Sequence, residues 1–267
     1  MMMHKNTISA VSLALAAVIG GVISFWVIGR NEAGDRNRTV APAVQGKTAP
    51  DCAYNIVRVT GFKRVRPLLS SEPMCESPRF DTLRSNIGTA VDAMKASGQV
   101  SSASVYLRDF RKAEWTWYNG DEEYDPGSLL KVPLMLAWLS KNEQEAGTLD
   151  RAFVCEERDR GALDTPAFNS DQARPGRSYT VRQLLELAIV HSDNRATGML
   201  LRHMDPSKYN GTFTELGLEA PLMEAKAYRM NVRDYSVFMK ALYNSSLLSP
   251  SDSEYAVELM TRANFAK

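Results

Sequence analysis

The sequence contains little that supports metal, nucleotide or nucleic-acid chemistry. It has only three histidines, and they are too scattered to match the spacing of a metal-ligand motif. No glycine-rich loop resembles those that bind phosphate, and no basic stripe is interleaved with aromatic residues. The formal net charge of +1 provides no general attraction to nucleic acid. We therefore expect no metal, no cofactor and no nucleic-acid partner.

A Gly-x-Ser-x-Gly motif is also missing, and in many Ser-His-Asp hydrolases this motif carries the nucleophile. His191 is the only histidine close to a polar motif of interest. The sequence therefore gives little support for a Ser-His-Asp triad.

The three cysteines allow two interpretations. Cys52 and Cys75 bracket a short segment and would pair in an oxidising compartment, which leaves Cys155 free. Alternatively, all three are buried thiols of a cytoplasmic domain. The sequence leaves both interpretations open.

One long apolar run stands near the start of the chain. No charged residue occurs from 6 to 29, and the 21 residues of 8–28 would span about 30 Å as a helix. This length predicts a membrane anchor in residues 1–29, with Trp26 suited to the interface, and a cleaved signal sequence is the alternative. Residues 30–51 are polar and indicate a linker. We expect a membrane-anchored protein whose large domain is extracytoplasmic, in the periplasm or at the cell surface.

Residues 52–76 are predicted to form a small segment bracketed by the first two cysteines. Residues 54–62 are typical of a strand, and residues 63–73 are typical of an extended return that includes a turn. The sequence does not indicate a function for this segment.

The front of the main domain, predicted as residues 77–267, combines one helix with two strands. Apolar residues recur at helical spacing across 77–97, and Gly98 suits a helix stop. Residues 100–107 and 114–118 alternate instead, which predicts a β-hairpin. The two tryptophans of the second strand share one face, which suits core packing better than a ligand platform.

A hairpin of two strands is only marginally stable by itself. Either the segment after Cys52 completes the sheet, or the chain stops before its own sheet is finished. We favour the second explanation.

Almost everything after residue 128 is predicted to be helical, and capping signals mark several helix starts. The predicted features are a Thr180 and Gln183 capping box, a helix over Asn194 to Met204, a start at Asp205-Pro206, an amphipathic helix over Met230 to Tyr243, and a last helix opened by Pro250 and a Ser251 to Glu254 box.

The single Ser-x-x-Lys motif, Ser128 and Lys131, opens a largely apolar helix that runs to Leu136. A spacing of three on a helix places both side chains on one face, about 5–6 Å apart at Cβ. A lysine whose pKa is lowered by burial can take the proton of a serine hydroxyl, and the helix N-terminus favours the oxyanion that follows. By itself, however, the pair is more typical of an N-cap serine followed by a surface lysine.

A second polar motif, His191-Ser192-Asp193-Asn194, lies between two predicted helices. Ser192 is 64 residues beyond Ser128, so the two residues can meet only through tertiary folding. This order resembles the class A β-lactamases and the related penicillin-binding proteins, in which a hairpin, a Ser-x-x-Lys helix and an inter-helix Ser-Asp-Asn loop follow one another. The resemblance covers residues 77–267. It implies an α+β, β-lactamase/transpeptidase-like fold in which a helical domain packs on an antiparallel sheet, with that sheet incomplete in this chain.

The resemblance also implies a role for each polar residue. Ser128 would be the acylated nucleophile, and Lys131 the base that activates it or relays its proton. Ser192 would carry the proton to the leaving nitrogen, Asn194 would bind the amide side chain of the substrate, and Asp193 would brace the loop. The implied activity is that of a serine hydrolase acting on β-lactams or D-Ala-D-Ala-type peptides of peptidoglycan, and we expect a monomer.

Two features of that family are not found. A Lys-Thr/Ser-Gly motif occurs nowhere, and Lys267 falls where the family is still in the helix ahead of it, so we expect a truncated chain. No Glu-x-x-Leu-Asn run supplies the class A deacylation base. Glu219 and Glu224 lie in about the right region, but both suit solvated loop positions. An acyl-enzyme without such a base would persist, which is penicillin-binding behaviour. The alternative is a catalytically inactive, membrane-anchored module that binds peptidoglycan or a partner.

Overall fold

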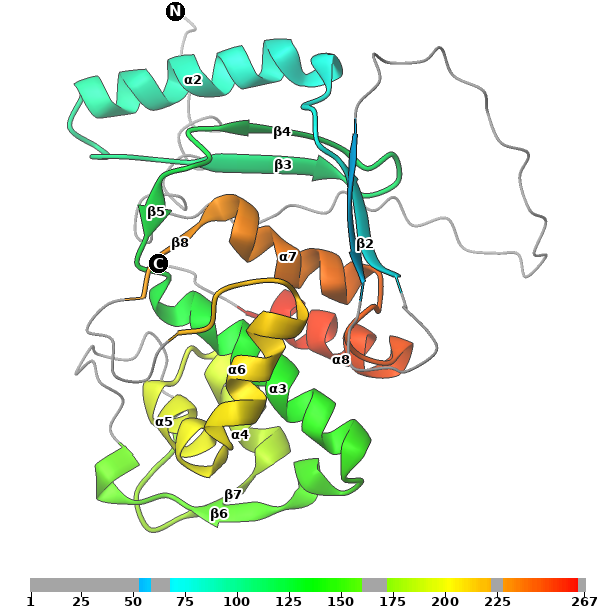
Figure 1. Cartoon of the computed structure of the whole chain (residues 1–267). Helices are drawn as coiled ribbons and strands as arrows, with labels where there is room; N and C mark the ends of the chain where they lie inside the picture. The colour runs from blue at the N-terminus through cyan, green and yellow to red at the C-terminus, as the bar shows by residue number, and fades with distance from the viewer. Residues whose placement is uncertain (1–52, 59–67, 160–171, 222–227, 264–267) are drawn as a thin grey trace, which may run out of the picture. The chain divides into compact units, whose positions relative to one another are not determined.

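The computed structural model describes residues 53–58, 68–159, 172–221 and 228–263 (Figure 1). The chain divides into two compact units. The first comprises residues 1–55 with 72–120, and the second comprises residues 56–71 with 121–267. Both units combine helices with short antiparallel strands, in agreement with the predicted α+β class.

The predicted anchor (residues 1–29) and linker (residues 30–51) lie outside the described residues. Within the residues that the structure does describe, no helix is both long enough and apolar enough to cross a bilayer. Cys75 is disulfide-bonded, whereas Cys155 is a free, buried thiol. Cys52 also lies outside the described residues.

The first unit contains a helix and a hairpin. Helix α2 (Asp81–Ala96) follows a 3-10 turn, η1 (Pro78–Phe80), and the chain leaves it through Gly98 at φ +71°. Strands β3 (Val105–Asp109) and β4 (Glu114–Tyr118) pair antiparallel, with Val105 opposite Tyr118. The helix and the hairpin are confirmed, although the first strand starts at residue 105 and not at residue 100.

Strand β4 carries much of the packing of this unit. The Trp115 ring is buried and its Nε1 donates to the Pro73 carbonyl at 2.6 Å. One oxygen of Glu76 accepts from Arg84, from the Thr116 hydroxyl and from the Trp117 amide. These bonds hold the segment before α2 against the strand.

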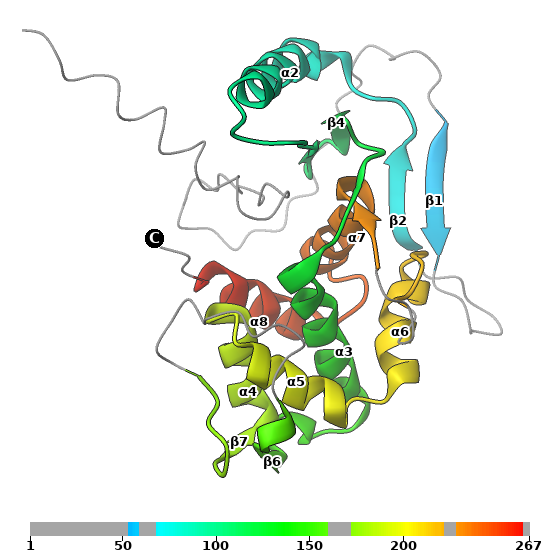
Figure 2. The ribbon, with the colours of Figure 1, turned by 90° about the vertical axis from the view of Figure 1, so that its left-hand side faces the viewer.

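The segment after Cys52 forms a hairpin of its own. Strands β1 (Tyr54–Arg58) and β2 (Leu68–Pro73) make a two-stranded sheet, and β3 and β4 make another (Figures 1 and 2). The two extended stretches are therefore confirmed at 54–58 and 68–73, and residues 59–67 with the predicted turn lie outside the described residues. They do not complete the β3–β4 sheet, because among the described strands β1 and β2 pair only with each other.

The second unit is mainly helical. Its elements in chain order are β5 (Glu123–Tyr124), η2 (Gly127–Leu130), α3 (Lys131–Gln144), η3 (Thr148–Asp150), β6 (Ala152–Val154), η4 (Glu157–Asp159), β7 (Ser178–Thr180), α4 (Val181–Val190), α5 (Asn194–His203), α6 (Pro206–Glu215), β8 (Met230–Asn231), α7 (Val232–Tyr243) and α8 (Pro250–Thr261).

Helix α3 lies at the centre of this unit, among the other helices in both views (Figures 1 and 2). Every residue from Lys131 to Leu139 is buried, as expected for a helix whose apolar residues cover its whole circumference. Short antiparallel pairs, β5 with β8 and β6 with β7, tie the connecting segments together.

Side-chain caps begin most of these helices. The Thr180 and Gln183 capping box is confirmed at α4, and Asp205 caps α6 ahead of Pro206 as predicted. The predicted Ser251 box at α8 is wrong, because Ser249 is the cap and accepts from the Asp252 amide. Pro250 occupies the first helical position, so the cap must precede it.

Candidate active site

Ser128 lies on an exposed turn that leads into the buried helix α3. The Asp125 carboxylate accepts from the Gly127 amide at 2.9 Å, and Gly127 adopts a left-handed backbone at φ +49°. The chain then enters the 3-10 turn η2 and becomes α-helical only at Lys131. Ser128 therefore stands one short turn before the helix and remains exposed to solvent.

Lys131 is buried at the first position of α3, with 6% of its surface exposed. Its amine donates to three oxygens of the Ser-Asp-Asn turn. They are the Ser192 carbonyl at 2.6 Å, the Ser192 hydroxyl at 2.9 Å and the Asn194 Oδ1 at 2.9 Å. All three N–H bonds of the ammonium are thus used, and the two motifs meet as the family resemblance implies.

Ser192 joins Lys131 to Ser128. Its hydroxyl accepts from the Lys131 amine and donates to the Ser128 hydroxyl at 3.2 Å. Its backbone is left-handed, with φ +52°, which few residues other than glycine adopt. This conformation presents both its carbonyl and its hydroxyl to the amine. The sequence suggested direct reach between the two residues of Ser-x-x-Lys, whereas the hydrogen-bonded path in the structure runs through Ser192.

The environment of Lys131 changes its acidity. Burial lowers the pKa of the amine from 10.5 to about 8, and the nearby Asp193 carboxylate opposes part of that change. About a tenth of the molecules would carry a neutral amine at pH 7. A buried lysine with such a pKa can accept a proton near neutral pH.

Asp193 braces the turn, as the resemblance implied. One carboxylate oxygen caps α5 by accepting from the Arg195 amide at 2.8 Å, and the other accepts from the buried Ala173 amide at 2.6 Å. Asn194 is the first residue of α5, so the Asp193 cap also fixes the position of the Asn194 backbone, from which its side chain extends.

A comparison with protein families identifies the fold that carries this arrangement. The model of Beta-lactamase2, described as the Beta-lactamase enzyme family, matches residues 84–267, which is more than half of the chain. The chain belongs to the β-lactamase enzyme family. A comparison with curated proteins gave no match.

Several solved structures share the fold of this β-lactamase-family chain. It is similar to a β-lactamase from Sphaerobacter thermophilus DSM 20745, with 20% identity and a TM-score of 0.55 over 67% of this chain and 69% of the other. PBP-A is similar at 20% identity and a TM-score of 0.57, over 70% and 71% of the two chains. A variant of PBP-A, solved as its acyl-enzyme complex with penicillin G, is similar at 20% identity and a TM-score of 0.54, over 68% and 69%.

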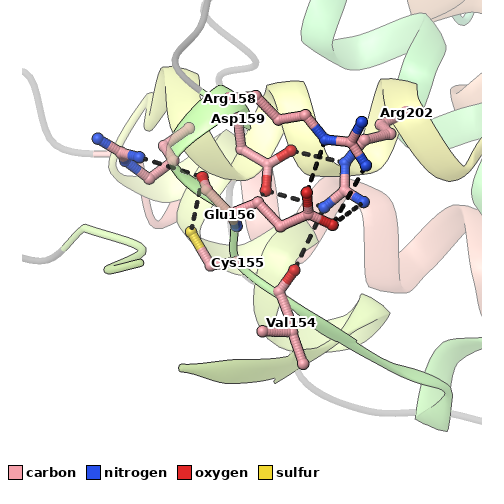
Figure 3. Close-up of polar contacts among 7 residues, drawn as sticks. Val154, Cys155, Glu156, Arg158, Asp159 and Arg202 are labelled. Atoms are coloured by element: carbon pink, nitrogen blue, oxygen red, sulfur yellow. Dashed lines mark hydrogen bonds and ion pairs between the residues drawn. The ribbon is translucent and has the colours of Figure 1, made fainter. Parts of the chain in front are cut away.

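A polar cluster beside α5 was not predicted from the sequence of this β-lactamase-family chain (Figure 3). The Arg202 guanidinium donates to both oxygens of Asp159, at 2.7 and 2.9 Å, and to Glu156 at 2.9 Å. Burial raises the pKa of the Asp159 carboxyl. The hydrogen bonds from Arg202 and the Glu156 amide together lower this pKa by more than burial raises it, so the net shift is downward. The cluster clamps η4 onto the helix that carries Asn194.

Gly198 allows this close approach. A Cβ at this position of α5 would lie 2.8 Å from the Asp159 carbonyl oxygen, so only glycine fits without a shift of the backbone. No local sequence signal could reveal the ion pair between Arg202 and Asp159, because these residues are 43 apart in the chain.

Of the two glutamates considered as a deacylation base, only Glu219 lies within the described residues. Glu219 is exposed, and its carbonyl accepts from the Tyr228 hydroxyl at 2.7 Å. Glu224 lies outside the described residues. In the part of the chain that is described, no group of three His, Cys, Asp or Glu side chains could hold a metal ion.

Proposed function

We propose that this protein is a serine hydrolase that forms an acyl-enzyme on Ser128 with β-lactams or with D-Ala-D-Ala-type peptides. The observation that carries the proposal is the hydrogen-bonded path from the Lys131 amine through the Ser192 hydroxyl to the Ser128 hydroxyl. A serine nucleophile needs a base within reach, and a buried amine with a pKa of about 8 is such a base.

The first half of the reaction follows from this path. When Lys131 is neutral, the Ser192 hydroxyl can give its proton to the amine and accept the proton of Ser128. The Ser128 oxygen then attacks the carbonyl carbon of the amide, and the carbonyl π electrons move onto its oxygen. Backbone N–H groups at the exposed turn favour that oxyanion. The result is a tetrahedral intermediate, in which the Ser128 oxygen is bonded to the former carbonyl carbon, and an ammonium at Lys131.

The second half returns the proton. The oxyanion re-forms the carbonyl and the C–N bond breaks, while the Lys131 ammonium gives a proton to Ser192 and Ser192 protonates the leaving nitrogen. An ester on Ser128 is left. In this proposal the side chain of Asn194, whose Oδ1 accepts from the Lys131 amine, also hydrogen-bonds the amide side chain of the substrate. Water or an amine then resolves the ester at Ser128.

We expect the acyl-enzyme to last longer than in an efficient β-lactamase. Glu219 is an exposed loop residue, so it is not held as a base for deacylation in the way that Lys131 is held for acylation. Support for acylation by penicillins comes from PBP-A, whose variant was solved as an acyl-enzyme with penicillin G.

The proposal is tested by incubating the full chain with a labelled penicillin and measuring its intact mass. The expected result is one covalent adduct, mapped to Ser128, that disappears in Ser128→Ala. The matched control is Ser140→Ala, which removes a hydroxyl from α3, the helix that follows Ser128, away from the Lys131 amine. Absence of an adduct in the wild-type protein would overturn the proposal and leave a binding module. A chromogenic lactam then distinguishes turnover from slow acylation.

We further propose that the domain works outside the cytoplasm. The disulfide at Cys75 supports an oxidising compartment. Thiol alkylation under denaturing conditions without reductant, on protein purified from its native membranes or envelope, should label one cysteine in three. Labelling of all three cysteines would contradict this location.

A further inference from the structure

A proline lies close to the start of the helix that follows the Ser128 turn. Pro133 is the third residue of α3, and the residues before it are already helical through η2. In a continuous α-helix the amide of residue 133 would donate to the Leu129 carbonyl, four residues earlier. Proline has no N–H and its ring crowds that carbonyl, so this bond cannot form. The Lys131 amide divides its hydrogen bond between two acceptors, the carbonyl oxygens of Ser128 and Leu129. The Leu129 carbonyl therefore receives only part of one backbone hydrogen bond.

A tyrosine hydroxyl from a helix distant in the sequence donates a hydrogen bond to this carbonyl. The Tyr235 hydroxyl of α7 donates to the Leu129 oxygen at 3.3 Å. Tyr235 is buried, and its ring packs edge-on against Phe238, with centroids 5.8 Å apart. Burial also raises the pKa of the phenol, which keeps it a neutral donor at any working pH. The donor therefore comes from a side chain held by the core.

The shape of the turn decides how Ser128 meets the rest of the site. A 3-10 turn places residues three apart on the same face with a rise of about 6 Å, whereas an α-helix turns them apart by about 60° with a rise of about 4.5 Å. The longer rise separates Ser128 from Lys131 and leaves space for the Ser192 hydroxyl, which lies 3.2 Å from one and 2.9 Å from the other.

We propose that Pro133 and Tyr235 are positioning residues that hold the Ser128 turn in its 3-10 form, so that Ser192 can stand between Ser128 and Lys131. Pro133 removes the competing α-helical bond, and Tyr235 satisfies the carbonyl that is left. This inference rests on the proposed acylation of Ser128 for its kinetic test only, because the shape of the turn can be measured in the unreacted protein.

The first test is Tyr235→Phe, which removes only the hydroxyl. We expect acylation by a labelled penicillin, measured per folded molecule, to slow about tenfold, since relaxation of the turn misplaces the nucleophile. The matched control is Tyr209→Phe, a buried tyrosine that packs on Phe213 in the same unit. The control should acylate within about twofold of wild type. Wild-type rates in Tyr235→Phe would overturn the proposal.

The second test adds Pro133→Ala, which returns an N–H that can satisfy the Leu129 carbonyl. We expect Pro133→Ala to restore the thermal stability that Tyr235→Phe loses, but not its acylation rate, because the turn then becomes α-helical. A merely structural role for Tyr235 predicts that rate and stability recover together. That result would also overturn the proposal.

Hydrogen exchange supplies a readout that does not need Ser128 to react. Tyr235→Phe should speed exchange at least fivefold for the peptide covering residues 127–133, and Tyr209→Phe should not. If wild type forms no adduct but this difference is found, the proposed function fails and the positioning stands. If exchange in the turn is unchanged by Tyr235→Phe, the positioning fails whatever the activity.

Discussion

The Lys131 amine donates to both the carbonyl and the hydroxyl of Ser192, at 2.6 and 2.9 Å. One residue thus contacts the amine through both its carbonyl and its hydroxyl, and in the proposed mechanism the hydroxyl carries the proton. The left-handed backbone of Ser192 makes this double contact possible. The protonation state of Lys131 and the conformation of residue 192 are therefore the two properties on which activity should depend.

Acylation of Ser128 should depend on pH through Lys131. The amine acts as a base only when neutral, and burial lowers its pKa to about 8. The acylation rate should rise about tenfold per pH unit between pH 6 and 7.5 and level off above about pH 8.5. Stopped-flow measurements with a fluorescent penicillin check this. A rate that is flat from pH 6 to 9 would rule out Lys131 as the base.

The same pKa predicts a change in stability with pH. Between pH 8 and 10.5 the folded protein binds fewer protons at Lys131 than the unfolded chain, so its free energy of unfolding rises with pH in that window. Below pH 8 the buried charge destabilises the fold. The stability of Lys131→Met relative to wild type should therefore be highest at low pH, and this advantage should shrink by about 3 kcal/mol between pH 7 and pH 10.5. Urea unfolding at each pH measures the difference in unfolding free energy between the two proteins. The contributions of the other lysines and of the tyrosines are the same in both and cancel. An advantage that does not vary with pH would contradict the lowered pKa.

The role of the Ser192 hydroxyl can be separated from the strain of its backbone. Ser192→Ala and Ser192→Gly both remove the hydroxyl, so both should slow acylation about 100-fold. Only glycine accepts φ +52° without strain, so the glycine variant should be more stable than the alanine variant by about 0.5–1 kcal/mol. If the glycine variant acylated at the wild-type rate, the backbone and not the hydroxyl would be what matters.

Asp193→Asn should affect both the loop and the amine. Asparagine offers one acceptor oxygen where the carboxylate accepts from both the Arg195 and Ala173 amides, so about 1–3 kcal/mol of stability should be lost. The carboxylate also raises the pKa of Lys131, so its removal should move the midpoint of the pH–rate profile below that of wild type. A midpoint shifted to higher pH would contradict this arrangement.

The Arg202 clamp should matter for stability. Replacing Arg202 with methionine leaves the buried Asp159 carboxylate without its two strongest donors and should cost about 2–3 kcal/mol, less than for a fully buried pair because Arg202 retains 22% exposure. Arg202→Lys, which keeps the charge but not the fork, should cost less.

Acid provides the control for this clamp. The pKa of Asp159 is lowered in the folded protein, so its contribution is present above about pH 4 and is lost as pH falls further. The gap in unfolding free energy between wild type and Arg202→Met should therefore narrow below pH 4. A gap that widens in acid would mean that Asp159 is not ionised in the cluster.

Much of the second unit could be predicted from local patterns. Capping residues indicated the starts of α4 and α6, and the apolar run after Ser128 indicated a buried helix, because these signals act within one or two turns. The meeting of Ser128 with Ser192 could be predicted only from the order of two motifs in a known family. The structure then supplied the contact itself.

Other features could not be predicted because tertiary contacts decide them. Tyr235 meets the Leu129 carbonyl across 106 residues, and Arg202 meets Asp159 across 43. Pro133 was visible in the sequence, and its missing N–H could have pointed to a distorted first turn. At α8, serines flank Pro250 on both sides, and serine propensity alone does not show that Ser249 is the cap.

Gly198 has a consequence for how this family member can vary. A glycine inside a helix weakens it by about 1 kcal/mol relative to alanine, yet here any side chain would push into the Asp159 carbonyl, 2.8 Å away. Most engineering rules would replace such a glycine to strengthen the helix. At this position the usual improvement should fail, and a saturation library sorted for folded protein should return glycine at residue 198.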